Sequence, residues 1–90
     1  NGLDNASLVE LFAWDQQTFE VRLAGSPIRR IGYSQWLRNI AVGLGNGPYS
    51  NETIKALQIR QDDPSALVRE HVQWALKQQE NKQLLGKNSR

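Results

Sequence analysis

Cysteine is absent from the 90-residue chain. The chain therefore forms no disulfide, offers no thiolate nucleophile and cannot ligate an iron–sulfur cluster through sulfur. His71 is the single histidine. Without a second imidazole or any thiolate, the sequence argues against a metal site built from protein side chains alone.

Long hydrophobic runs are also missing. The apolar runs are only a few residues long, whereas a helix that spans a bilayer needs roughly 20. The opening stretch, NGLDNASLVEL, lacks the basic region of a signal peptide and does not begin with methionine. We therefore expect a fragment of a longer protein, cytoplasmic and without membrane contact. Its composition, 39% hydrophobic and 22% charged, is that of an ordinary globular domain.

Acidic residues are lacking from a central stretch of the chain. No Asp or Glu occurs from Val21 through Asn51, and this stretch holds four arginines, namely Arg22, Arg29, Arg30 and Arg38. The net charge is only +2, so it is the distribution of charge that is unusual. Such asymmetry indicates an anionic partner such as nucleic acid, although a solvated basic face without function gives the same pattern.

What is present reads as helices separated by caps. Ser7 is a plausible N-cap of the first helix, and Asp15 caps a second that ends near Gly25. A further helix begins at Ser26–Pro27, with Gly32 as a possible break. Residues 34–44 have apolar side chains at helical spacing, and residues 45–50 form the clearest loop.

A shorter helix follows this loop, and a last one begins after a cap at Asp63–Pro64. Because no stretch alternates with period two, the sequence predicts an all-α fold of about five helices. We predict a single domain over residues 1–80 and a polar, frayed tail over residues 81–90. The spacing places five aliphatic side chains in one core: Ile40, Leu44, Val68, Val72 and Leu76.

The tryptophans Trp14, Trp36 and Trp74 lie among aliphatic residues at helical spacing. Core packing is the favoured interpretation, and stacking on exposed bases is the alternative.

Two segments of the chain echo one another. Each has a cap, a proline, an aliphatic–arginine pair and a helix that ends in leucine, and Arg38 and Arg69 are 31 residues apart. This period is typical of helical repeats, and the pattern is similar to HEAT-like repeats, which stack into a short α–α superhelix. In such repeats the arginine runs between units and pairs with a cap aspartate, so we predict structural roles for Arg38 and Arg69.

Four sequence stretches carry a family resemblance: FAWDQQTF, GSPIRRIGYSQWLRN, GLGN and ALQIRQDDPSALVREHVQWAL. Together they resemble the C-terminal region of bacterial epoxyqueuosine reductases, from about Leu8 to Gln79. The resemblance implies a parent oxidoreductase that reduces epoxyqueuosine to queuosine at the wobble position of tRNA. It also implies cobalamin and two [4Fe–4S] clusters, held by an upstream catalytic part.

For this chain, the resemblance implies a HEAT-like accessory domain with no catalytic residue and no cofactor of its own. Its expected partners are the anticodon arm of tRNA and the catalytic domain of the parent, and we expect the fragment to be monomeric. The alternative is a structural or protein-interaction domain that packs on the catalytic part without touching RNA.

Arg29 and Arg30 are the leading candidates for RNA contact. The planar guanidinium fork suits phosphate, and at a helix start the dipole disfavours cations, which hints at an external anion. The alternative is an ion pair with Glu20, Asp15 or the acids at 62–63. The further candidate RNA-binding residues are Tyr33, Asn39, Lys55 and Arg60.

RNA binding requires the basic side chains Arg29, Arg30, Lys55 and Arg60 to share one face. Protein interaction alone would instead leave a contiguous apolar patch.

Overall fold

The computed structural model describes residues 5–88, and most of them are helical. The elements are α1 (Asn5–Phe12), α2 (Gln16–Arg22), a 3₁₀ helix η1 (Pro27–Ile31), α3 (Tyr33–Asn46), α4 (Asn51–Ile59) and α5 (Ala66–Asn88). There is no strand among these residues, so the predicted all-α fold of about five helices is confirmed.

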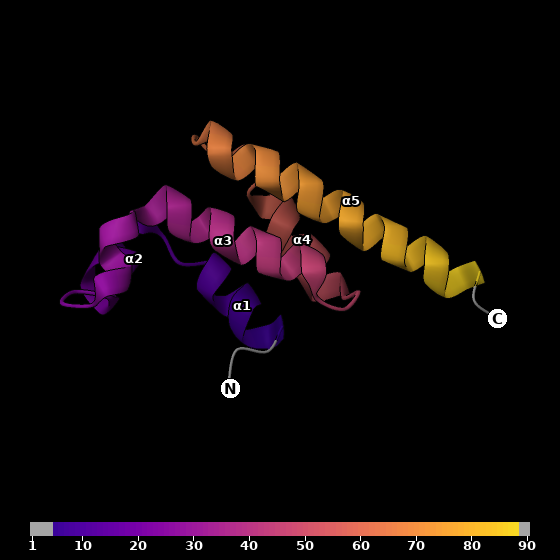
Figure 1. Cartoon of the computed structure of the whole chain (residues 1–90), viewed down its shortest axis with the longest axis horizontal. Coiled ribbons are helices and arrows are strands. Elements are labelled where there is room, and N and C mark those ends of the chain that lie inside the picture. Colours follow the sequence, from indigo (N-terminus) through magenta and orange to yellow (C-terminus); the bar gives the residue numbers. More distant parts are fainter. Residues whose placement is uncertain (1–4, 89–90) are drawn as a thin grey trace.

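Helices α3 and α5 run side by side, with α5 along one long edge of the molecule (Figure 1). Helix α1 packs against α3 and α4, α4 packs against α5, and α2 and η1 contact α3. The result is an elongated, thin body of 49 × 30 × 16 Å. Helix-on-helix packing of this kind is compatible with a HEAT-like repeat, which stays a prediction. Between residues 5 and 88, no helix has the length and apolarity that crossing a membrane requires.

The core lies between α3 and α5, as the sequence predicts. Leu44, Val68 and Val72 have no exposed surface, Ile40 is buried, and Leu76 packs against them. Two of the tryptophans also pack inside: the Trp36 ring is buried, and Trp14 stacks on it with ring centroids 5.4 Å apart. Trp74 differs, because 38% of its surface is exposed. The expectation of core packing is therefore wrong for Trp74.

Two of the predicted caps are confirmed. The carboxylate of Asp15 accepts a hydrogen bond from the Thr18 backbone N–H at 2.8 Å. This bond, with a second one from the Thr18 side chain, holds the pKa of Asp15 below its usual value of 3.8. Ser26 Oγ accepts from the Ile28 N–H at 3.2 Å and begins η1.

Other predicted boundaries shift by a few residues. Helix α1 begins at Asn5, so Ser7 lies inside it, and α2 ends at Arg22, with Gly25 two residues past the C-cap at φ +81°. Helix α5 continues to Asn88, so the part of the predicted tail that the structure describes is helical; residues 89 and 90 lie outside it.

The cap of α5 is Ser65 rather than Asp63. Ser65 Oγ accepts from the Val68 N–H at 3.3 Å, and the first helical bond runs from Arg69 N–H to the Ser65 carbonyl. Asp63 acts one step earlier, accepting from the Ser65 N–H at 2.9 Å.

Candidate nucleic-acid interface

Arg29 and Arg30 lie on η1, a five-residue 3₁₀ helix. Ser26 caps it and Pro27 opens it, while Gly32, at φ +89°, separates it from α3. The two arginines therefore occupy the last turn of a short helix, not the first turn of a long one. The expectation that a helix dipole disfavours these cations is wrong, because Gly32 ends η1 before α3 begins and the two arginines therefore lie at the C-terminal end of their own helix.

Arg29 makes an exposed ion pair. Its Nη2 and Nε atoms lie 3.0 Å and 3.3 Å from Glu20 Oε1, and the two side chains are 49% and 43% exposed. Glu20 was one of the acidic partners that the sequence left open. Exposed pairs of this kind contribute only about 0–1 kcal/mol, so a phosphate can replace the carboxylate at little cost.

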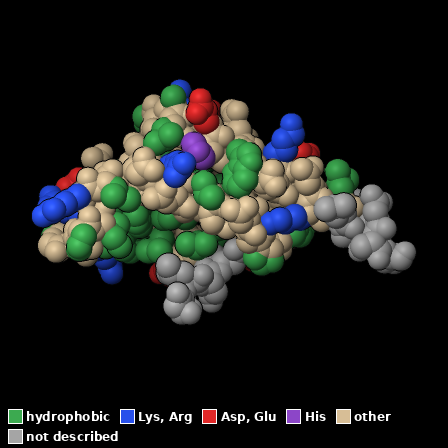
Figure 2. Space-filling view, in the orientation of Figure 1, with side chains coloured by type: hydrophobic (Ala, Val, Ile, Leu, Met, Phe, Trp, Pro, Cys, Tyr) green, Lys and Arg blue, Asp and Glu red, His purple; other side chains and the backbone are tan. Residues whose placement is uncertain are grey.

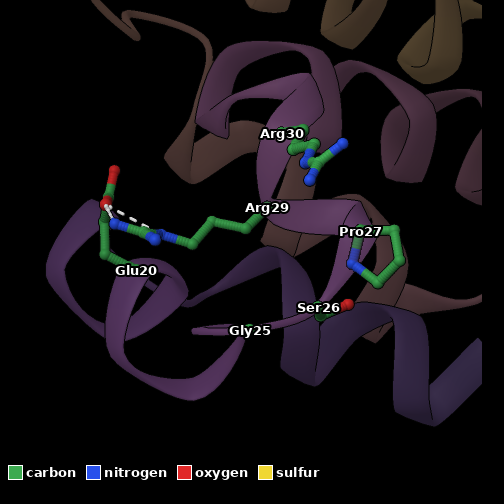
Figure 3. A pocket seen from close by; sticks show the side chains of 6 residues that line it. All are labelled: Glu20, Gly25, Ser26, Pro27, Arg29 and Arg30. Atoms are coloured by element: carbon green, nitrogen blue, oxygen red, sulfur yellow. Dashed lines mark hydrogen bonds and ion pairs between the residues drawn. The ribbon is translucent and has the colours of Figure 1, made fainter.

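Arg30 is exposed and, within residues 5–88, makes no side-chain hydrogen bond or ion pair. Figure 3 shows it pointing away from the Arg29–Glu20 pair. Both arginines line an open pocket of about 520 Å³, together with Glu20, Gly25, Ser26 and Pro27. Two guanidinium groups therefore line one surface pocket that has a single carboxylate, and this carboxylate pairs with Arg29 alone.

Arg22 adds a third cation to this end of the molecule. It is exposed at the end of α2, and its guanidinium carbon lies 5.6 Å from the centroid of the Trp14 ring. The space-filling view shows basic side chains gathered at the end where Figure 1 places α2 (Figure 2). Arg22 is not among the RNA contacts that the sequence predicts. The signal that points to it is its place in the stretch from Val21 through Asn51, which has no acidic residue.

Arg60 points into the structure rather than out of it. Its Nε donates to the Phe12 carbonyl at 2.7 Å, and its Nη2 donates to the Trp14 carbonyl at 2.8 Å and to the Tyr33 hydroxyl at 3.0 Å. An ion pair with Asp63 at 3.1 Å completes the set, and the Arg60 side chain is only 16% exposed. The guanidinium group is therefore engaged within the fold.

Tyr33 belongs to the same internal network. Its hydroxyl donates to the Trp14 carbonyl, and its ring lies 5.6 Å from that of Phe19. Burial raises the pKa of Tyr33 above its ordinary value. Neither Tyr33 nor Arg60 contributes to the exposed basic surface.

The remaining predicted contacts, Asn39 and Lys55, lie elsewhere on the surface. Asn39 Oδ1 accepts from Arg38 Nη1 at 2.9 Å and from Gln35 Nε2 at 3.3 Å. Lys55 stands on α4 and lines a separate pocket whose walls are mostly apolar. The structure thus brings Arg29 and Arg30 together on the surface, joins Tyr33 and Arg60 within the fold, and places Asn39 and Lys55 apart from both pairs.

The two arginines predicted to be structural both make contacts within the fold. Arg38 Nε, on α3, lies 3.2 Å from His71 Nε2 on α5. Arg69 Nη1 donates to the carbonyl oxygens of Asp63 at 2.6 Å and Pro64 at 3.1 Å. Arg69 bonds these carbonyls and not the Asp63 carboxylate, because that carboxylate pairs with Arg60 and accepts from Ser65.

The residues of this chain do not fit the iron–sulfur clusters that the resemblance implies for the parent. There is no cysteine to ligate a cluster. Over residues 5–88, no three His, Asp or Glu side chains come together as a metal site.

The chain is similar to the C-terminal part of curated epoxyqueuosine reductases. It is 62% identical over 78 residues to the protein from Xanthomonas campestris, 56% over 77 residues to that from Pseudomonas aeruginosa, and 57% over 89 residues to that from Burkholderia pseudomallei. These matches cover 87%, 86% and 86% of this chain and 22%, 21% and 22% of the relatives. The resemblance inferred from the sequence is confirmed.

The chain spans about a fifth of the length of the curated relatives that it matches. No protein-family model matches it, and no solved structure does.

Proposed function

We propose that this chain is the C-terminal module of an epoxyqueuosine reductase and that Arg29 and Arg30 bind the phosphate backbone of the tRNA substrate. The similarity to enzymes of that name, over more than four fifths of the chain, supports the first part. The pair of exposed guanidinium groups on η1 carries the second part. One is held only by an exposed carboxylate, and the other is unpaired within the described residues.

In this proposal the module binds and orients RNA, and the chemistry takes place elsewhere. The parent reduces epoxyqueuosine to queuosine at the wobble position with cobalamin and iron–sulfur clusters in its upstream part. Each guanidinium can donate two parallel hydrogen bonds to phosphate oxygens, which fixes the direction of the RNA strand as well as adding attraction. The Arg29 guanidinium is already oriented by its two hydrogen bonds to Glu20, and an incoming phosphate would replace the Glu20 carboxylate as its partner.

Reversing both charges tests the proposal. In the full-length protein, Arg29→Glu with Arg30→Glu should weaken tRNA binding. It should also reduce the slope of log Kd against log salt by about 1–2, because binding releases fewer counterions when phosphate contacts are lost. Lys77→Glu, an exposed charge reversal on α5, changes the net charge by half as much as the double reversal and so matches each of the single reversals Arg29→Glu and Arg30→Glu. An unchanged salt slope, or loss of the fold, would show that these arginines serve structure rather than RNA.

A second candidate function rests on a different surface. The pocket between α1 and α4, about 500 Å³, is lined by the apolar residues Val9, Phe12, Ala13, Ala56 and Ile59 and by Glu52, Lys55 and Arg60. Ile59 is 81% exposed there. An apolar groove of this kind favours docking of the module on the remaining four fifths of the parent protein. The two functions use separate surfaces, so both can hold.

A further inference from the structure

Trp74 is an exposed aromatic side chain held in a fixed position. A Cβ atom built on Gly45 would lie 2.6 Å from Trp74 Cζ3, so glycine at this position of α3 is what lets the indole lie directly on the helix backbone. Gly45 itself is buried, whereas 38% of Trp74 remains exposed. The indole is therefore an exposed surface that is already ordered before any partner arrives.

The groove beside this indole combines apolar and hydrogen-bonding groups. It has a volume of about 430 Å³, and Val42 and Asn46 of α3 and Glu70, His71 and Trp74 of α5 line it. This volume falls within the range of small-molecule sites. Within residues 5–88, the side chains of Asn46 and Glu70 make no hydrogen bond or ion pair, so both are available to a ligand.

His71 is fixed at the edge of the groove. Its Nδ1 lies 2.8 Å from the Leu67 carbonyl, and its Nε2 accepts from Arg38 Nε at 3.2 Å. Nδ1 must then carry the proton, because it faces an acceptor while Nε2 faces a donor. The imidazole and the guanidinium thus hold α3 and α5 together beside Trp74.

We infer that this groove takes an unstacked nucleobase of the bound RNA, with Trp74 as its stacking surface; the inference rests on the proposed tRNA-binding function. A base offers the flat face that an indole stacks on and an edge of donors and acceptors that an amide and a carboxylate can bond. A phosphate fits poorly, because Glu70 would repel it. An apolar protein surface would bury Asn46 and Glu70 without partners, which is costly.

The position of the groove suits an RNA that also reaches η1. Asn46 lies at the far end of α3 from Gly32, and the 14 residues of α3 span about 20 Å. Figure 2 shows the single histidine on the face turned to the reader, and basic side chains at the α2 end appear in the same view. One strand can therefore place a phosphate on η1 and a base beside Trp74.

The test measures tRNA affinity of the full-length protein at several salt concentrations. Trp74→Ala should weaken binding by about 5- to 100-fold, the loss expected for one stacked base, and leave the salt slope unchanged. Trp74→Phe should restore most of the affinity because it retains an aromatic face. Leu84→Ala removes an exposed apolar side chain elsewhere on α5 and should bind as wild type.

A second probe isolates the base from the backbone. An RNA oligonucleotide and an abasic oligonucleotide of equal length carry the same phosphates, so wild type should prefer the former and Trp74→Ala should lose that preference. Circular dichroism of each variant confirms that the helices persist.

The outcomes separate this inference from the function on which it rests. If the Arg29 and Arg30 reversals weaken binding while Trp74→Ala binds as wild type, the base site is refuted and the RNA-binding function stands. Failure of the wild-type protein to bind tRNA refutes both. If Trp74→Ala instead loosens the module from the rest of the protein at unchanged RNA affinity, Trp74 is a protein contact.

Discussion

Arginines in this chain have two opposite environments that the residue type alone does not distinguish. Arg29 and Arg30 stand on a short exposed helix, whereas Arg60 is almost enclosed. The partners of Arg60, the carbonyls of Phe12 and Trp14, lie 48 and 46 residues away in the sequence. No local sequence pattern predicts a contact between residues so far apart. The expectation that Arg60 faces outward rests on its charge alone.

Replacing Arg60 should cost stability rather than RNA affinity. Arg60→Ala removes the guanidinium donor from the part-buried carbonyls of Phe12 and Trp14 and the ion-pair partner of Asp63, and the expected loss is about 3 kcal/mol of unfolding free energy. Arg60→Lys should recover little of it, because an ammonium cannot reach several acceptors in different directions as the guanidinium fork does. Urea unfolding of the 90-residue chain measures the stability of both variants. Full stability of Arg60→Lys would contradict the assigned role of the Arg60 hydrogen bonds.

At the scale of elements, the parts that could be predicted are those fixed by nearby residues. Asp15 and Ser26 cap the residues that directly follow them, and the aliphatic spacing of α3 and α5 places their core faces correctly. The start of α5 differs from the prediction because two cap-like residues on either side of Pro64, Asp63 and Ser65, act in series. The sequence offered no means of ranking them.

The parts that could not be predicted depend on contacts between distant elements. Gln79 reads as an outward polar residue of α5, yet it is fully buried. Its amide donates to the Leu44 carbonyl at 2.9 Å and the Pro48 carbonyl at 3.2 Å, and its oxygen accepts from the Ser50 N–H. The loop between α3 and α4 thus obtains its hydrogen bonds from α5. Trp74 is the converse, an apolar residue that the fold leaves exposed.

The pairing of α3 with α5 predicts the effect of truncating its centre. Leu44 has no exposed surface and lies among core residues of both helices. Leu44→Ala should lower the unfolding free energy by about 2–5 kcal/mol, through lost burial and the cavity that remains. Ile59→Ala, on an exposed side chain, should change it by no more than about 0.5 kcal/mol. Thermal unfolding of both variants provides the measurement, and equal melting temperatures would contradict the helix register.

The whole molecule separates two surfaces that the sequence had merged into one basic face. Arg29 and Arg30 mark the end formed by η1, and Lys55 lies instead beside the apolar groove between α1 and α4. The four basic side chains expected to share one face therefore do not: Arg60 is engaged within the fold, Lys55 lines the groove, and only Arg29 and Arg30 stay together. The apolar patch expected for protein interaction is present. A module with a basic end and an apolar groove can hold a nucleic acid on one side and its own parent on the other.

This separation predicts that the two surfaces fail independently. Ile59→Glu puts a charge into the apolar groove and should weaken docking of the module on the rest of the parent protein. A protease should then release the module from the full-length protein about tenfold faster or more, since cleavage follows the population of molecules in which the module is undocked. The salt slope of tRNA binding should not change. Leu84→Glu, an equally charged change at another exposed site on α5, should leave the release rate as in wild type. Charge reversal of Arg29 and Arg30 should change the salt slope of tRNA binding and leave the rate of module release as in wild type. If Ile59→Glu and the arginine reversals change both readouts together, the two surfaces form one interface and the division is wrong.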